Sequence, residues 1–380
     1  MRNPERRWLC CTLLCGAAIA GLLLGIASSG EPVCLDKTER ERSTGTAFVV
    51  FSPDGKWLAA AMHWEIAVWD FATREKVATK PYKIVKPYDA GFAAIAFMPD
   101  SQGIVHADDG GRVCLWDGSA GWADGTEREL LGQRVDADGR PITGHICVQE
   151  IAISPDGKLL AVPRGRRTIK VVEIATGKEV GDLDIGHSVN SVQFAEEGRV
   201  LVVGTPGTTR DNPEVQFWDM DTLTAKETLR IVKPPKVFAV VSPAILSPTE
   251  KLLAVPLDML NRATEIRFYE LPSCRWTTLA NNGRLMPSLA FSRDGSLLAV
   301  PTHHGRNDPA AVLVWDLRAK SWRRFDSPAE IAQKNVAFLN AKFSPDGRYL
   351  AGGLFHPQVA VCIWDLQAEA DTSESSGTSR

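Results

Sequence analysis

The sequence lacks the motifs that identify many enzymes, and it has little net charge. It contains no phosphate-cradling glycine loop, no paired CxxC, no HExxH and no G-x-S-x-G segment. Its 43 Lys and Arg residues nearly balance 46 Asp and Glu residues, which leaves a net charge of -3 and no broad basic field for nucleic acid. Only seven histidines are present. We therefore expect no catalytic residues, no cofactor, no resident metal and no nucleic-acid partner.

The N-terminal segment differs in composition from the rest of the chain. Residues 1–7 form a cationic flank, and residues 8–27 form an uncharged apolar run of 20 residues. A helix of that length spans a bilayer, so the run predicts a transmembrane anchor. The small residues 27–29 keep a cleaved signal peptide as the alternative, and a lipoprotein is a third option. In each case a polar spacer (28–43) follows, and the rest of the chain is expected outside the cytoplasm.

One pattern recurs seven times between residues 44 and 367, and it is clearest in the segment FSPDGRYLAGGLFHPQVAVCIWDL, residues 343–366. A strand leads into a Ser-Pro-Asp-Gly turn, in which Pro fixes φ and Gly accepts a positive φ. A largely buried second strand follows, and a third strand closes on an aromatic residue and an acid. No unit can bury its own apolar faces, so the seven must stack around an axis. The first strands end at seven anchor positions: 51, 97, 153, 194, 246, 291 and 343.

These repeats resemble the WD40 family over about 85% of the chain. The matching motifs are Trp-Asp at 69–70, 116–117, 218–219, 315–316 and 364–365, and Gly-His at 144–145 and 186–187. The resemblance implies an all-β, seven-bladed propeller over residues 44–367. The tail at 368–380 lacks apolar periodicity and is expected to be disordered. The family closes its ring with an N-terminal strand, but the candidate here, roughly residues 33–43, is highly charged, so an imperfectly closed seventh blade is possible. The resemblance also implies a set of core aromatics between blades: Trp69, Trp116, Trp218, Tyr269, Trp315 and Trp364.

The eight cysteines suggest no evident disulfide framework. Cys114 and Cys362 occupy the same site in two different repeats, two residues before the tryptophan. Equivalent sites in separate blades lie too far apart for a disulfide, whose Cα atoms must approach within about 7 Å. We interpret both as small buried hydrophobic residues. The other cysteines lie in the apolar run or have no assigned role: Cys10, Cys11, Cys15, Cys34, Cys147 and Cys274.

The loops between second and third strands are the candidate partner-binding surface. Several are longer than a propeller needs, and in such folds they share one face of the disc. Their excess arginine suits a partner that carries carboxylates or phosphates, although simple solvated loops are the alternative. Four of the residues, His303, His304, Asp308 and His356, also have ligand types that suit a metal. The candidate set is Trp64, Arg164, Arg166, Arg167, Arg210, Asp211, Arg262, His303, His304, Arg306, Asp308, Phe355 and His356.

Together these patterns predict a non-catalytic scaffold, tethered to a membrane through residues 8–27, that binds a protein partner. No small-molecule substrate is indicated. A propeller hydrolase or lyase at the mouth of the channel is one alternative. A module that binds a glycan or polymer of the cell envelope is another.

Overall fold

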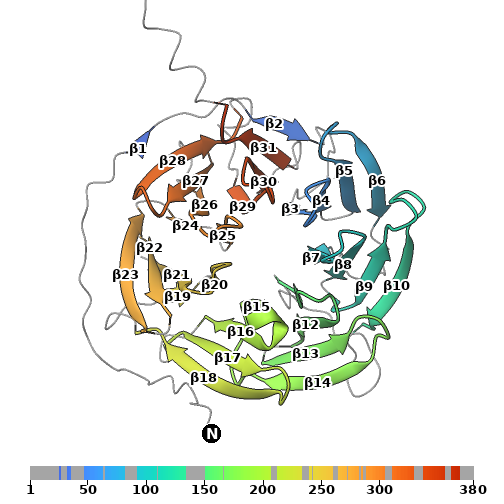
Figure 1. The fold of residues 1–380 in the computed structure, drawn as a ribbon, viewed down its shortest axis with the longest axis horizontal. Helices are drawn as coiled ribbons and strands as arrows, with labels where there is room; N and C mark the ends of the chain where they lie inside the picture. Colours follow the sequence, from blue (N-terminus) through green and yellow to red (C-terminus); the bar gives the residue numbers. More distant parts are fainter. Residues whose placement is uncertain are drawn as a thin grey trace, which may run out of the picture.

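The structure is a ring of seven antiparallel sheets around a central axis (Figure 1). It is a computed structural model of the chain. It describes residues 25–26, 32–35, 47–62, 65–81, 92–108, 110–133, 150–165, 167–206, 212–232, 239–241, 243–259, 264–271, 273–281, 284–285, 288–303, 310–328, 337–355 and 361–368. The seven repeats correspond to seven blades, so the all-β propeller predicted from the sequence is confirmed.

The first four blades follow one another along the chain. Blade one contains β3 (Ala47–Phe51), β4 (Trp57–Met62), β5 (Glu65–Asp70) and β6 (Lys76–Pro81). Blade two contains β7 (Phe92–Phe97), β8 (Gly103–Asp108), β9 (Val113–Asp117) and β10 (Thr126–Leu131). Blade three contains β11 (Ala152–Ile153), β12 (Leu159–Pro163), β13 (Thr168–Glu173) and β14 (Glu179–Asp184). Blade four contains β15 (Ser191–Ala195), the 3-10 turn η1 (Glu196–Gly198), β16 (Val200–Thr205), β17 (Glu214–Asp219) and β18 (Thr224–Arg230).

The remaining blades vary the plan at their edges. Blade five contains β19 (Ala239–Val241), β20 (Ile245–Leu246), β21 (Leu252–Met259), β22 (Thr264–Glu270) and β23 (Arg275–Asn281). Blade six contains β24 (Arg284–Leu285), β25 (Ala290–Phe291), β26 (Leu297–His303), β27 (Ala311–Asp316), β28 (Ser321–Asp326) and β1 (Gly25–Ile26). Blade seven contains β29 (Ala337–Phe343), β30 (Tyr349–Phe355), β31 (Val361–Asp365) and β2 (Val33–Leu35). Each blade runs outward from the axis as a meander, so the turns after first and third strands share one face and those after second strands share the other.

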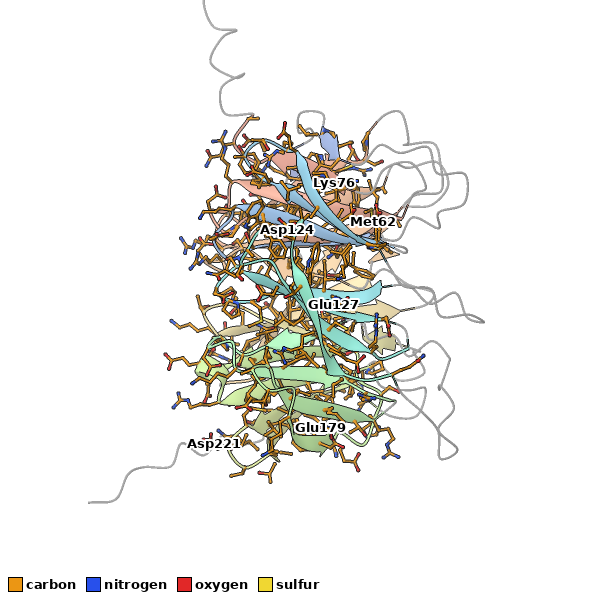
Figure 2. The ribbon with its side chains drawn as sticks, turned by 90° about the vertical axis from the view of Figure 1, so that its right-hand side faces the viewer. Met62, Lys76, Asp124, Glu127, Glu179 and Asp221 are labelled. Atoms are coloured by element: carbon orange, nitrogen blue, oxygen red, sulfur yellow. The ribbon has the colours of Figure 1, made fainter. Side chains whose placement is uncertain are left out.

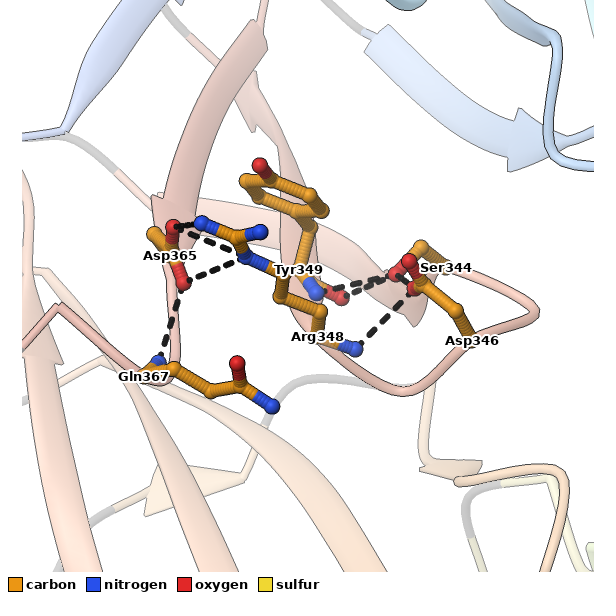
Figure 3. Close-up of polar contacts among 6 residues, drawn as sticks. All are labelled: Ser344, Asp346, Arg348, Tyr349, Asp365 and Gln367. Atoms are coloured by element: carbon orange, nitrogen blue, oxygen red, sulfur yellow. Dashed lines mark hydrogen bonds and ion pairs between the residues drawn. The ribbon is translucent and has the colours of Figure 1, made fainter.

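The Ser-Pro-Asp-Gly segments form the turns between first and second strands (Figure 3). In blade seven the Ser344 hydroxyl donates to the Asp346 carboxylate and accepts the backbone N–H of Tyr349 at 2.9 Å. Asp346 in turn accepts the backbone N–H of Arg348 at 3.0 Å, while Gly347 takes a φ of 72°. These bonds fix the turn, and through it the register of the two strands. The Ser–Asp hydrogen bond recurs between Ser52 and Asp54, Ser154 and Asp156, and Ser292 and Asp294.

The acid that follows the repeat tryptophan caps the turn after the third strand. Asp70 accepts the backbone N–H groups of Ala72 and Thr73 at 2.9 and 3.0 Å. Asp365 accepts the N–H of Gln367 at 3.0 Å and pairs with Arg348 at 2.7 Å (Figure 3). Because Asp side chains readily mimic a backbone turn in this way, the acid of each Trp-Asp pair has a local structural role here.

Seven apolar clusters lie between adjacent blades, and the repeat aromatics fill six of them. In blade three Val172 occupies the position and packs in the cluster shared with blade two. Trp218 donates its indole N–H to Gln216 at 3.0 Å, whereas the indole N–H groups of Trp315 and Trp364 meet no acceptor among the described residues. The prediction that these aromatics are core residues is confirmed. All six are at most 8% exposed: Trp69, Trp116, Trp218, Tyr269, Trp315 and Trp364.

The ring is closed by an N-terminal strand, which resolves the question that the sequence left open. β2 pairs antiparallel with β31, and it supplies the outer strand that blade seven would otherwise lack (Figure 1). Leu35 of β2 is 7% exposed and packs in the cluster between blades seven and one. Only the first three residues of the candidate segment form this strand, and residues 36–43 lie outside the described part of the chain. Part of the predicted polar spacer is therefore a structural element.

The N-terminal apolar run does not appear as a helix where the structure describes it. Gly25 and Ile26 form the strand β1, which pairs in parallel with β28 at Trp322 and Arg323. The outer strand of a blade offers unpaired backbone groups, and glycine and β-branched residues are poorer helix formers than alanine or leucine. The rest of the run, residues 8–24 and 27, lies outside the described residues. In the part of the chain that the structure describes, no helix is long and apolar enough to cross a membrane.

Candidate ligand channel and loop face

A cavity of about 680 Å³ lies at the centre of the ring. Its walls come from the first strands of all seven blades or the residues that flank them, so it is the central channel of the propeller. The walls are mainly apolar, with Phe48, Ile95, Ile151, Val192, Leu289 and Phe343 among them. A pocket of this size and character would accept a small ligand if polar groups converged in it.

Two amide side chains of the channel wall are used to join neighbouring blades. Asn340 accepts the backbone N–H of Val49 at 3.0 Å and donates to its carbonyl at 2.9 Å. Gln193 likewise accepts from the N–H of Leu246 at 3.0 Å and donates to its carbonyl at 3.2 Å. The innermost strands have no further strand toward the axis, so these backbone groups need side-chain partners. Both amides therefore have structural roles.

Glu150 and Lys342 are the two charged residues among those that line the channel. Burial raises the pKa of the Glu150 carboxyl, although the charge of Lys342 and the backbone N–H of Val192 both favour its ionised form. A buried carboxyl with a raised pKa is a typical functional-site candidate, and structural charge networks produce the same shift. Glu150 is thus a candidate for acid–base chemistry in this channel.

The strand ends place four of the predicted partner-binding residues at one face of the disc. Arg164 and Arg167 lie between β12 and β13, while His303 and Phe355 are the last residues of β26 and β30. In the edge-on view of Figure 2, Met62 lies toward this face, and Asp221 lies at the opposite one. The other predicted residues lie outside the described part of the chain: Trp64, Arg166, Arg210, Asp211, Arg262, His304, Arg306, Asp308 and His356.

Arg164 and Arg167 differ in what their side chains do. The Arg164 guanidinium donates to the carbonyl of Gly132 on the preceding blade at 2.9 Å, which makes it a link between blades two and three. Arg167 is exposed, and its backbone carbonyl accepts the N–H of Ile185 at 2.8 Å. Of the two, Arg167 is the more exposed.

A buried polar cluster that the sequence analysis missed lies between blades one and two. His106, Cys114 and Glu127 come from β8, β9 and β10, and their possible ligand atoms all lie within 4.8 Å of one another. Glu127, on the outer strand in Figure 2, approaches His106 Nε2 at 3.2 Å and Lys80 Nζ at 2.9 Å. The hydrogen bond from His106 and the charge of Lys80 hold the pKa of Glu127 well below its usual range despite burial.

Cys114, which the sequence predicts to be a small buried residue, belongs to this cluster. Cys114 is 2% exposed, as expected of a buried residue, and burial raises the pKa of its thiol to about 12. The three donor types suit a transition metal, but the ammonium of Lys80, 2.9 Å from Glu127, already pairs with the carboxylate. The geometry is best explained as an ion-pair network that joins two blades. The signal in the sequence was His106, which stands in a buried second strand where blade three has Val162.

Comparisons with known proteins give the fold and nothing finer. No family model matches the chain, and no curated protein matches it significantly. Among solved structures it is similar to Kuenenia stuttgartiensis hydrazine synthase, with a TM-score of 0.65 and 17% identity over 86% of this chain and 96% of that one. The fold is a seven-bladed β-propeller.

Two further structures support the same statement. The β-propeller domain of Cps50 (Swd1) from Myceliophteria thermophila has a TM-score of 0.63 and 17% identity, and the match covers 86% of this chain and 98% of that domain. A chain in a structure of a mitotic checkpoint complex has a TM-score of 0.63 and 16% identity, over 89% of this chain and 95% of that one. At such low identities the likeness concerns the propeller architecture alone.

Proposed function

We propose that the protein is a non-catalytic scaffold that binds a protein partner through the loops between its second and third strands. The observation that carries this proposal is the mainly apolar wall of the central channel. An active site needs several polar groups that converge on a reacting atom. In the described channel wall, the amides of Asn340 and Gln193 are hydrogen-bonded to neighbouring blades. Glu150 and Lys342 are the two charged residues of that wall.

The comparisons are in keeping with a scaffold. One of the similar chains belongs to a multiprotein assembly, the mitotic checkpoint complex. Propellers of this type commonly use their rigid disc to present loops, because loops held by a rigid scaffold carry binding residues. Here the exposed Arg167 and the arginines of the neighbouring loops would recognise carboxylates or phosphates on the partner.

We also propose that the propeller lies outside the cytoplasm. The support is the cationic flank 1–7 followed by the apolar run 8–27, which would either anchor the chain in a membrane or be removed as a signal peptide. The nearly neutral charge of the chain speaks against a nucleic-acid partner.

A matched pair of charge variants tests the loop face. The first changes arginines of the loop face to serine, and the second removes five exposed basic residues from the opposite face. Arg164 is left intact because it links two blades. The loop-face set is Arg166, Arg167, Arg210, Arg262 and Arg306. The control set is Lys56, Lys158, Lys178, Arg275 and Arg318.

The readout is capture of a partner from detergent-solubilised membranes, with folding of each variant checked by near-ultraviolet circular dichroism. We expect the unchanged chain and the control variant to capture the same protein, and the loop-face variant to lose it at least tenfold. Loss in both variants would assign the effect to net charge, and retention in both would place the binding surface elsewhere. Capture of an envelope glycan in place of a protein would favour the glycan-binding alternative.

An enzyme that works in the channel is the second candidate, and Glu150 is the observation that favours it. A carboxyl with a raised pKa in a cavity is suited to general acid–base work. One of the similar structures, hydrazine synthase, is by its name an enzyme. The test is a screen of hydrolase and lyase substrates with the unchanged chain and with Glu150→Gln. A turnover that the variant abolishes, without loss of folding, would replace the scaffold proposal.

A further inference from the structure

Two cysteines face each other at the point where the ring closes. Cys34 of β2 and Cys362 of β31 are directly opposed in the antiparallel register, between the pairs Val33–Ile363 and Leu35–Val361. Their Sγ atoms are 3.5 Å apart. Opposed residues in an antiparallel pair have Cα atoms about 4.5–5.5 Å apart, which lies within the roughly 4.4–6.8 Å that a disulfide requires. The backbone therefore already has the spacing that a disulfide between these cysteines needs.

We propose that Cys34 and Cys362 are a cross-linking site, at which a disulfide fastens the closing strand to the last blade. The other described cysteines, Cys114 and Cys274, lie on blades two and five, so neither is placed to compete for this pairing. The inference follows from the register of β2 and does not depend on the proposed scaffold function.

The oxidant is a disulfide compound, either a small one such as glutathione disulfide or the oxidised active site of a thiol–disulfide oxidoreductase. The thiolate of Cys34, which is the more accessible of the two, attacks one sulfur of the oxidant and releases the first thiol. The thiolate of Cys362 then attacks Sγ of Cys34 and releases the second thiol. The two cysteines lose two protons and two electrons in total, and the oxidant is reduced to two thiols.

The position of the pair explains why a covalent bond is useful there. β2 has three residues, whereas the fourth strands that the other six blades supply from their own repeats have six or seven. Val33 of β2 is 53% exposed, so little apolar area holds this end of the strand. A short outer strand of this kind frays unless something ties it down.

The surroundings of the sulfurs would protect the bond once formed. Cys362 is fully buried, and Cys34 packs against the cluster between blades six and seven, which contains Phe338 and Trp364. Thiol–disulfide exchange needs access of a thiolate to one of the two sulfurs. A soluble reductant can therefore reach the bond only at the half-buried Sγ of Cys34, and the cross-link should persist in an oxidising compartment.

The test uses the full chain, purified with reductant and then incubated with glutathione disulfide. Free thiols are blocked, the chain is digested without reductant, and linked peptides are identified by mass spectrometry. We expect one dominant linked pair that joins Cys34 to Cys362. A dominant link between Cys34 and any other cysteine, or no link at all, overturns the proposal without the need for a variant.

A second measurement checks that the link acts at the ring closure. The thermal midpoint of the oxidised chain should exceed that of the reduced chain by roughly 5 °C. Cys34→Ser should abolish this difference, and the matched variant Cys274→Ser, which changes a half-buried cysteine on blade five, should retain it. An equal difference in all three proteins would show that oxidation acts at another site.

Discussion

Blade seven differs from the other six in how it is assembled. In blades one to six the four main strands follow one another along the chain, and short turns fix the register of each outer strand. Blade seven takes its outer strand from the opposite end of the sequence, since Cys34 and Cys362 are separated by 328 residues. The apolar core of blade seven is nevertheless as well buried as the others, with Phe338 and Leu350 fully buried. The comparison therefore indicates that the outer strand β2, and not an apolar core, is the least stable part of the ring.

The largest expected effect comes from the cores, where the two kinds of blade should behave alike. Trp364→Ala in blade seven and Trp315→Ala in blade six each empty a site that is at most 3% exposed. Each should lower the free energy of unfolding by about 3–5 kcal/mol, measured by urea denaturation. A much smaller loss for Trp364 would mean that the core of blade seven is looser than its burial indicates.

Truncation of a leucine in β14 and in β2, the outer strands of blades three and seven, should lower the free energy of unfolding by different amounts. Leu183 of β14 is fully buried, and Leu183→Ala should cost about 2–5 kcal/mol of global stability. Leu35→Ala should cost less, because the three-residue strand β2 can detach while the rest of the ring stays folded. Hydrogen exchange should then accelerate at the amides of β31 that face β2. If the two variants lose equal stability and β31 remains protected, the closing strand is no weaker than the rest.

A substitution in the polar cluster between blades one and two should leave the pairing of β2 with β31 unchanged. Glu127→Gln removes the carboxylate that pairs with Lys80 and His106, and should cost about 1–3 kcal/mol at pH 7. The pKa of Glu127 is lowered by folding, so its contribution is present above the unfolded value near 4.3 and is lost as the pH falls below it.

Urea titrations at pH 7 and pH 3 check this, and the gap between the unchanged chain and the variant should narrow at the lower pH. The amides of β31 provide the control and should exchange at the same rate in both proteins. A gap that widens toward pH 3 would contradict a folded-state pKa below the unfolded one.

The smallest effect belongs to the exposed ion pair of blade seven. Arg348 and Asp365 are 2.7 Å apart, with side chains 48% and 24% exposed. Arg348→Ala should lower the free energy of unfolding less than any other variant here, and less still in 1 M salt. A loss as large as that of Glu127→Gln would give this surface pair a larger role than its exposure allows.

Asp294 lies in the corresponding turn of blade six, and hydrogen bonds from Ser292 and Ser296 lower its pKa to about 2. Asp294→Asn should therefore destabilise the folded chain only above that pH.

The parts of the fold that the sequence predicted are those that repeat. The turn between first and second strands recurs in seven repeats, three times as Ser-Pro-Asp-Gly, and six repeats have the aromatic at the end of the third strand, so each repeat supports the assignment of the others. The closing strand could not be assigned in the same way. β2 has three residues, too few to show an alternation, and its partner is not the next segment along the chain. Its position depends on the closure of the whole ring.

The candidate sites were harder to predict than the fold for a related reason. His106, Cys114 and Glu127 belong to three strands, and their proximity depends on a register that spacing alone does not encode. The channel is similar, because Glu150 and Lys342 come from opposite halves of the sequence. On the loop face, Arg164 matched the pattern of a partner-binding residue, but its guanidinium donates a hydrogen bond to the carbonyl of Gly132 on the preceding blade.

The composite seventh blade also determines when the protein can be finished. Chains are synthesised at about 5–20 residues per second. The 328 residues that separate Cys34 from Cys362 therefore take on the order of tens of seconds to synthesise. During that time β2 exists without the strand to which it pairs, and six blades can form before it is used. Completion of the ring is therefore a late event that depends on the first part of the chain still being free when the last part emerges.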